Sequence, residues 1–377
     1  MNITQYVKSF GNKEFKELPF NEIDSLIFSE LSYINFDLEI DSTDFIKIKD
    51  LKIKDSKAFY YGSVDAKNNK KLLEAMMKSK RYQNVKIGYC KLLNNHESRK
   101  QFFAMTLLLP NHVAYIAYRG TDTSLLGWKE SLSLVYEEAM PSKDLAVEYI
   151  RTATTLFKGK FYVGGHSKGG YLAMCAVLFM GEKLEERLIK AYTFDGPGLK
   201  EDVEKLDSFN RIKDKLEKYL TTHDVIGVVY NHASNAKIVY STGVLLGGHD
   251  PFKWMVNYHN MTFSYTRARS FSSRKSEEAM MNWLTNESDE DKRLAIEVLF
   301  DVLGDSKTIY DLLLNASRII SNGKKKFKSY TVKRREKTKE IFKSLGRYYL
   351  TAYSPKRFLM KNKNDVKQIE KKTENQS

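Results

Sequence analysis

The segment around Ser167 has the residue types and spacing of a nucleophilic site. Gly165-His-Ser-Lys-Gly169 fits the pattern G-x-S-x-G and stands between an apolar strand-like segment, 161–163, and an apolar helix expected over 169–180. In that context the serine occupies a sharp, strained turn, and the flanking glycines leave room for the neighbouring backbone. The serine then lies at a helix N-terminus, where the amide of Lys168 can stabilise a developing oxyanion. We therefore interpret Ser167 as the candidate nucleophile.

A serine nucleophile needs a histidine base from elsewhere in the chain, because the side chains of His166 and Lys168 should diverge from the hydroxyl. Such a strand-to-helix turn with a serine at its tip is called a nucleophile elbow, and it is followed in the chain first by an acid and then by the histidine. We favour His249, which lies in a loop after the last expected strand and can reach across to the elbow. Three other histidines follow Ser167. His223 is expected at the rim of the site, and His232 and His259 are expected to be ordinary polar positions.

Two aspartates at strand ends are candidates for the acid that holds the imidazole. Asp195 closes the expected strand 189–194, and Asp224 closes the expected strand 218–221. The order of strands favours Asp224, because the acid usually follows the second strand after the elbow, and Asp195 remains the alternative. Asp250 stands next to His249 and is expected to be a turn or cap residue.

A second oxyanion donor should come from a loop that follows an earlier strand. Thr121 stands just after the expected strand 113–118, and Gly120 before it permits a close approach of the backbone. The same residues could form a plain turn, so this segment is weak evidence by itself. Together with the elbow, it predicts an oxyanion hole made by Lys168 and Thr121.

The hydrophobic patterning predicts an α/β fold that brings these residues to one edge of a sheet. Three consecutive strands should open the sheet in antiparallel fashion, after which helices and strands alternate as in a parallel sheet. The expected strands are 85–93, 102–109, 113–118, 161–163, 189–194, 218–221 and 236–240, where the sheet should end. The expected helices are 22–34, 72–77, 128–136, 142–157, 169–180, 276–284, 289–303 and 308–320.

Five motifs in this order resemble an uncharacterised bacterial α/β-hydrolase family, described as Mbeg-like, which is itself similar to class 3, fungal-type lipases. They are Tyr118-Arg-Gly-Thr-Asp, Gly127-Trp-Lys-Glu, Gly164-Gly-His-Ser-Lys-Gly-Gly, Phe194-Asp-Gly-Pro-Gly and His249-Asp-Pro-Phe-Lys-Trp. The resemblance covers roughly 6–256 and implies an α/β-hydrolase fold with a mixed, mostly parallel sheet. It implies Ser167 as nucleophile, His249 as base, and Lys168 and Thr121 in the oxyanion hole. Class 3 elbows normally carry Leu where Lys168 stands, and the aspartate-glycine-proline-glycine motif keeps Asp195 open as the acid.

The bulk composition excludes several classes of protein. The chain has 377 residues, of which 42% are hydrophobic and 29% charged, so it can bury a sizeable core and is neither disordered nor collagenous. Cys90 and Cys175 lie in apolar runs and are expected to be buried free thiols. No zinc-ligand spacing, phosphate loop or dinucleotide fingerprint is found, so we expect neither a metal nor another cofactor. The first residues do not resemble a signal peptide and no long apolar run follows, which predicts a cytoplasmic protein.

The positive charge is concentrated at the C-terminal end. From residue 318 onward the chain has 19 Lys or Arg and five Asp or Glu, which accounts for nearly all of its net charge of +15. In 323–350 these cations alternate with aromatic and aliphatic residues. Three interpretations stay open: a solvated helical tail, contact with an anionic membrane surface, and, least favoured, nucleic-acid binding. We expect three regions: a hydrolase domain over 1–265, a helical appendage over 266–355 and a disordered basic tail over 356–377.

The sequence thus predicts a serine hydrolase that cleaves small acyl-ester or lipid-like substrates through an acyl-enzyme intermediate. It would be cytoplasmic, with possible peripheral contact at the inner membrane surface, and its oligomeric state is open. The alternative is a catalytically silent hydrolase fold that acts as a binding or scaffold protein and docks through its basic C-terminal helices. The two differ in whether Ser167 is an activated nucleophile.

Overall fold

The computed structural model describes residues 1–36, 38–54, 65–110, 112–230, 235–303 and 316–353. Its centre is a mixed sheet with the strand order β1-β2-β3-β4-β5-β6-β7-β8-β11. The strands of this sheet are β1 (Phe45–Lys47), β2 (Lys86–Asn95), β3 (Lys100–Leu108), β4 (Ala114–Tyr118), β5 (Phe161–His166), β6 (Leu188–Phe194), β7 (Leu216–Thr221), β8 (Lys237–Val239) and β11 (Tyr265–Thr266). A separate hairpin pairs β9 (Val256–Asn257) with β10 (Thr262–Phe263).

The mode of strand pairing changes from antiparallel to parallel at β4. Strands β1 to β4 pair in antiparallel fashion, and strands β4 to β8 pair in parallel fashion. This pairing confirms the predicted antiparallel start followed by a parallel sheet. Each parallel step needs a crossover on a face of the sheet, which is why helices alternate with strands in this part of the chain. With the elbow at the end of β5, the arrangement is an α/β-hydrolase fold with additional C-terminal helices.

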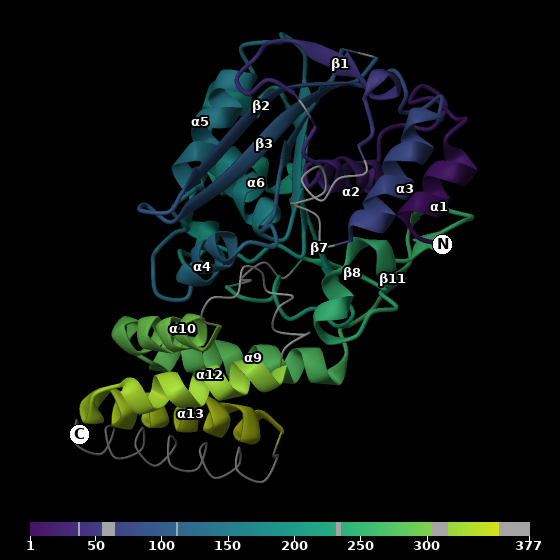
Figure 1. Cartoon of the computed structure of the whole chain (residues 1–377). Helices are drawn as coiled ribbons and strands as arrows, with labels where there is room; N and C mark the ends of the chain where they lie inside the picture. The colour runs from purple at the N-terminus through teal and green to yellow at the C-terminus, as the bar shows by residue number, and fades with distance from the viewer. Residues whose placement is uncertain (37, 55–64, 111, 231–234, 304–315, 354–377) are drawn as a thin grey trace, which may run out of the picture.

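Helices cover both faces of the sheet and form a third layer beside it (Figure 1). On one face lie α1 (Ile3–Phe10), α2 (Glu22–Leu31) and α3 (Ala66–Met77), and on the other α5 (Lys143–Ala153) and α6 (Lys168–Phe179). The remaining short helices are α4 (Leu125–Ser133), α7 (Glu182–Glu185), α8 (Asp207–Ile212), η1 (Ile48–Asp50), η2 (Val203–Lys205), η3 (Lys213–Lys215), η4 (Leu245–His249) and η5 (Pro251–Lys253). The C-terminal layer contains α9 (Phe271–Asn286), α10 (Asp289–Leu303), α12 (Ala316–Ser329) and α13 (Val332–Tyr353).

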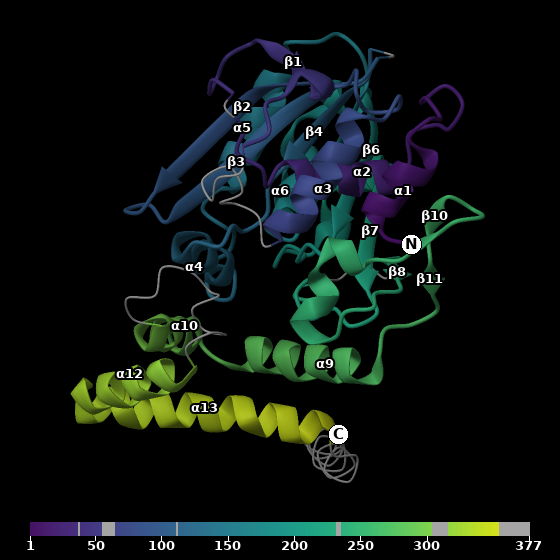
Figure 2. The same cartoon turned by 45° about the vertical axis from the view of Figure 1, so that its right-hand side comes forward.

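The C-terminal layer packs on the α/β body below α4 (Figure 2). Trp283 and Leu284 of α9 and Ile341 of α13 are buried in the same apolar cluster as Tyr171 and Leu172 of α6. The layer therefore shares a hydrophobic core with the elbow helix. None of the described helices combines the length and apolar composition needed to cross a bilayer.

The expectation that the sheet ends at 236–240 was wrong. Strand β11 adds to the edge, with Tyr265 opposite Val239 of β8 in antiparallel register. A two-residue strand has no period that the sequence could reveal, so only the tertiary pairing defines it. Part of the expected helix 308–320, and the expected tail 356–377, fall outside the described residues.

A buried ion pair fastens the N-terminal layer to the chain that leads into β2. The Arg81 guanidinium donates to both carboxylate oxygens of Asp24, at 2.8 and 2.5 Å, and the Tyr82 hydroxyl donates to the same carboxylate at 2.5 Å. Arg81 also donates to the backbone carbonyls of Lys13 and Leu18. Because both charged groups are inaccessible to water, each depends on the other for compensation.

We expect Arg81→Met to destabilise the protein by about 3–5 kcal/mol, since the substitution leaves Asp24 as a buried, uncompensated charge. Urea unfolding monitored by circular dichroism measures the change. Lys80→Met is the control, because Lys80 is exposed and its loss should change the free energy of unfolding by less than about 0.5 kcal/mol. A small effect of Arg81→Met would show that the pair does not hold the layer in place.

Candidate active site

Ser167 has the backbone strain expected of a nucleophile elbow. It joins β5 to α6 with φ 58° and ψ −129°, a conformation that residues with a Cβ atom rarely adopt. The turn is closed by the Ser167 N–H, which donates to the Phe194 carbonyl on β6 at 2.8 Å. The side chain points into a cavity of about 110 Å³.

The glycines beside Ser167 are required by close backbone contacts. A Cβ atom on Gly165 would lie 2.3 Å from the carbonyl carbon and oxygen of Gly169, and one on Gly169 would lie 2.1 Å from the Tyr118 carbonyl oxygen. Both contacts are with backbone, which cannot rotate away. This is the physical reason for G-x-S-x-G at a strand-to-helix turn packed against β4.

His249 lies opposite the elbow and is held by Asp195. Its Nδ1 is 3.2 Å from Oδ2 of Asp195, and the two residues are brought together by η4 and the end of β6. Asp195 is completely buried and also accepts hydrogen bonds from the N–H and hydroxyl of Thr221, at 3.0 and 3.4 Å. Burial raises the pKa of Asp195, and the hydrogen bonds from Thr221 act in the opposite direction. Burial lowers the pKa of His249, which favours a neutral imidazole.

The strand order favours Asp224 as the partner of His249, but in the structure Asp195 makes this hydrogen bond. Oδ1 of Asp224 accepts from the backbone N–H groups of Ile226 and Gly227, at 2.8 and 3.0 Å, so this carboxylate closes its own loop. Oδ2 of Asp224 is buried without a hydrogen bond among the described residues. Burial, aided by the neighbouring charge of Asp195, raises the pKa of Asp224 to about 7. The backbone of Asp195, with φ 47°, turns its carboxylate toward His249.

His166 supports the loop that carries His249. Its Nε2 donates to the His249 carbonyl oxygen at 2.9 Å, which leaves Nδ1 as an acceptor for the Tyr33 hydroxyl at 3.2 Å. The two imidazole rings lie 4.4 Å apart between centroids. Burial holds the pKa of His166 well below its usual value, so the ring is neutral. His166 is therefore a positioning residue, as its divergence from the serine suggests.

Three ligand atoms of His166, Asp195 and His249 lie within 4.8 Å of one another, a spacing compatible with a metal ion. Both ring nitrogens of His166 already have partners, and Nδ1 of His249 faces Asp195. A metal ion would have to replace these hydrogen bonds. The arrangement is therefore better explained as a hydrogen-bond network than as a metal centre.

The side chain of Lys168 points away from the cavity and into the protein. Its ammonium donates to Oε2 of Glu130 on α4 at 2.9 Å and to Oε1 of Gln101 on β3 at 2.7 Å. The residue is 2% exposed. Its backbone N–H belongs to the first turn of α6 and has no intrahelical acceptor. The side chain thus anchors the elbow to α4 and β3.

The cavity joins Ser167 to His249 and to residues of the N-terminal layer. It is lined by Glu30, Tyr33, Asp65, Thr121, Trp128, His166, Ser167, His249, Asp250, Pro251 and Phe252. Thr121 is present as expected, and its hydroxyl contacts that of Ser131 at 2.5 Å. In the described part of the chain no hydrogen bond joins the Ser167 hydroxyl to His249. Catalytic contacts of this kind are often long before substrate binds.

Sequence reasoning missed Glu30 and Tyr33. Burial raises the pKa of Glu30 to about 8, and its Oε1 has no hydrogen-bond partner among the described residues. Glu30 lies in the last turn of α2, and Tyr33 follows in the turn just after the helix ends at Leu31. Two polar groups on the apolar side of a predicted helix were a signal that could have been used.

Two further candidate histidines, His223 and His259, do not line the cavity. Nδ1 of His223 contacts the Ser270 hydroxyl at 3.1 Å, next to α9. His259 is exposed in the turn between β9 and β10, and His232 falls outside the described residues. The thiols of Cys90 and Cys175 are free and buried, and burial raises the pKa of each to about 12, so neither is a candidate nucleophile.

Comparison with known proteins connects this geometry to a family. The family model described as Mbeg1-like matches residues 76–301, which includes the elbow, both aspartates and His249. No curated protein matches the sequence. Among solved structures, M37 lipase is 17% identical with a TM-score of 0.38 and covers 56% of this chain and 70% of its own. Lip2 lipase from Yarrowia lipolytica is 12% identical with a TM-score of 0.31 and covers 58% of this chain and 76% of its own. The Rhizomucor miehei lipase propeptide complex is 16% identical with a TM-score of 0.29, and the match covers 45% of this chain and 59% of that protein.

The strain at Ser167 predicts an unusual order of stabilities. We expect Ser167→Gly to be more stable than Ser167→Ala by about 1 kcal/mol, because glycine adopts a positive φ without a steric penalty. Thermal and urea unfolding of the two variants measure the difference.

Ser276 in α9 provides the matched control, because in a regular helix glycine should instead be about 1 kcal/mol less stable than alanine. If glycine were also the less stable residue at position 167, the elbow would not be strained.

Proposed function

Because the chain belongs to the Mbeg1-like family, we propose that its cavity is the active site of a serine hydrolase that cleaves carboxylic esters. One observation carries the proposal: a histidine held at 3.2 Å by a buried aspartate lines the same cavity as a serine with the strained backbone of an elbow. A plain strand-to-helix turn needs none of these three features. Their combination supports a triad of Ser167, His249 and Asp195.

In the proposed reaction, Nε2 of His249 takes the proton of Ser167 while the serine oxygen attacks the ester carbonyl carbon. The carbonyl π electrons move to oxygen, and the resulting oxyanion accepts hydrogen bonds from the backbone of Lys168 and Thr121. Collapse of this intermediate breaks the ester bond, and the protonated His249 gives its proton to the departing alkoxide. Water then attacks the acyl-enzyme by the same steps and releases the acid. Asp195 keeps the imidazole oriented and stabilises its charged form.

The lining of the cavity supports an acyl or lipid-like ester. Trp128, Pro251 and Phe252 contribute apolar lining, and Glu30 and Tyr33 contribute polar groups. A cavity of about 110 Å³ holds the reacting ester group and only part of a long acyl chain. The remainder of a long substrate would therefore extend out of the cavity.

The alternative function, a silent hydrolase fold that docks through its basic helices, rests on the C-terminal layer. On α13, Phe342 and Leu350 are 48% and 65% exposed, and they are interleaved with cations such as Lys343 and Arg347. Exposed apolar residues among cations support contact with an anionic membrane surface more than with nucleic acid. We infer that the layer provides peripheral membrane contact at the cytoplasmic face and that the cavity provides the chemistry.

We expect wild-type protein to react covalently with a fluorophosphonate probe and to hydrolyse p-nitrophenyl esters. Ser167→Ala should abolish labelling and reduce hydrolysis by about 10⁴-fold or more, because it removes the attacking oxygen. Gel fluorescence and a spectrophotometric assay measure the two effects. Ser98→Ala is the matched control, since Ser98 is exposed on the turn between β2 and β3.

The pH profile gives a second measurement on the same proteins. Because burial lowers the pKa of His249, its neutral form should persist to below pH 6.5, and kcat/KM should rise with pH only under that value.

Labelling of Ser167→Ala at the wild-type rate would reject the nucleophile, and absent labelling of wild type would favour the scaffold function.

The two aspartates are distinguished by conservative variants. We expect Asp195→Asn to lower kcat by about 10³- to 10⁴-fold, because an amide holds the wrong tautomer of His249. Asp224→Asn should have a much smaller effect, since its Oδ1 binds only its own loop. Single-turnover kinetics and circular dichroism of both proteins separate lost chemistry from lost folding. A larger effect at Asp224 would restore the assignment that the strand order favours.

A further inference from the structure

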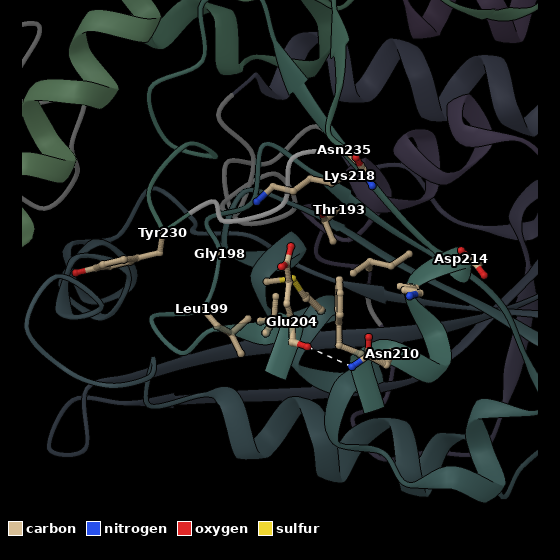
Figure 3. A pocket seen from close by; sticks show the side chains of 14 residues that line it. Thr193, Gly198, Leu199, Glu204, Asn210, Asp214, Lys218, Tyr230 and Asn235 are labelled. Atoms are coloured by element: carbon tan, nitrogen blue, oxygen red, sulfur yellow. Dashed lines mark hydrogen bonds between the residues drawn. The ribbon is translucent and has the colours of Figure 1, made fainter. Parts of the chain in front are cut away.

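A second and larger cavity, of about 520 Å³, lies on the α6 side of the sheet. Figure 3 shows it between the ends of β6 and β7, the segment after β6 and helix α8. Its volume is within the range of pockets that bind small molecules. Its lining is mixed: the buried apolar residues are Met174, Leu199, Val203 and Tyr230, and several exposed polar residues complete it. The proposed hydrolysis uses none of them.

Two of the polar lining residues are buried. Thr193 on β6 and Lys218 on β7 are opposite each other in the parallel register and are 2% and 8% exposed. The Thr193 hydroxyl has no hydrogen-bond partner among the described residues. Figure 3 shows the Lys218 side chain extending from β7 across the pocket. Buried groups of this kind are normally hydrogen-bonded, so their position in a pocket wall is informative.

Among the described residues, Lys218 has no counter-ion in direct contact. Within the part of the chain that the structure describes, no carboxylate forms an ion pair with its ammonium, and the charges that act on it at longer range are Asp224, Asp195 and Glu277. Asp195 is hydrogen-bonded to His249, and Oδ1 of Asp224 accepts from backbone N–H groups, while neither carboxylate lies within ion-pair distance of Lys218 among the described residues. Burial lowers the pKa of Lys218 to about 8, so its charged form is costly in the empty pocket. A bound anion would offset that cost.

We propose that this cavity is a binding site for an amphipathic carboxylate, of which a fatty acid is the simplest example. The carboxylate would accept hydrogen bonds from the Lys218 ammonium and the Thr193 hydroxyl, and the apolar body would lie against Met174 and Leu199. Two acidic residues, Glu204 and Asp214, also line the cavity, and both are exposed to solvent, which screens their repulsion. The site is independent of the proposed hydrolysis, because it shares no lining residue with the cavity at Ser167.

Isothermal titration calorimetry with decanoate below its micellar concentration tests the site. Lys218→Met should weaken decanoate binding by about tenfold or more, because it removes the charged donor and keeps a similar side-chain volume. Lys213→Met is the matched control, since Lys213 lines the same pocket at its exposed rim, and it should change the affinity by less than about twofold. Decanol should bind wild type about tenfold more weakly than decanoate, and equally to both variants.

A measurement on the wild type keeps the test independent of the folding of Lys218→Met. With methyl-labelled methionine, the Met174 resonance, assigned from Met174→Leu, should shift with decanoate and saturate at the calorimetric affinity. Undiminished decanoate binding to Lys218→Met, equal affinity for decanol and decanoate, or an unshifted Met174 resonance would each overturn the proposal. None of these outcomes depends on whether Ser167 is catalytic.

Discussion

The positive φ of Ser167 is the constraint on which the rest of the site depends. A side chain at this backbone conformation is stable only where the surrounding chain fixes the turn from several directions. Here β6 fixes it through the hydrogen bond from Ser167 to Phe194, and β4 fixes it through the contact between Gly169 and the Tyr118 carbonyl. The parallel pairing of β4, β5 and β6 therefore does more than form a core. It brings the serine, the end of β6 and the loop after β4 to one edge of the sheet.

The choice between the two aspartates illustrates what strand order determines. Order and polarity placed both carboxylates near the correct edge, and both influence the charge of His249 or of each other. The difference lies in two local conformations: Asp195 turns at φ 47° toward the imidazole, whereas Asp224 turns back to the N–H groups that follow it. A carboxylate followed by suitable N–H groups can always form such a local turn. The sequence holds one relevant difference: Pro197, two residues after Asp195, has no N–H group, whereas Ile226 stands at the corresponding position after Asp224.

The sequence predicted the elements whose signals are local, and missed those that arise from tertiary contact. The strands from β2 to β7 and the helices α5 and α6 were predicted because their apolar residues recur with a clear period. Helix α1 was missed although Asn2 and Gln5 form a capping box that the sequence contains. Strand β11 has two residues, and the partners of Lys168 lie 38 and 67 positions away. For contacts of this kind, one sequence without its three-dimensional pairing holds no signal.

Most of the net positive charge lies at the C-terminal end of the chain, and hydrogen bonds connect the C-terminal helical layer to the α/β body. The basic residues that give the chain its net charge lie beyond residue 318, on α12, on α13 and after them. The layer begins with α9, whose N-terminus is fastened beside the site, because the Ser270 N–H donates to the Thr222 carbonyl and the Ser273 hydroxyl to the Asp224 carbonyl. Since Asp224 closes the loop behind Asp195, displacement of α9 would be transmitted to the acid side of the site. A surface that binds α13 would thus be connected through α9 to the loop of Asp224, although no basic residue of α13 lines the cavity at Ser167.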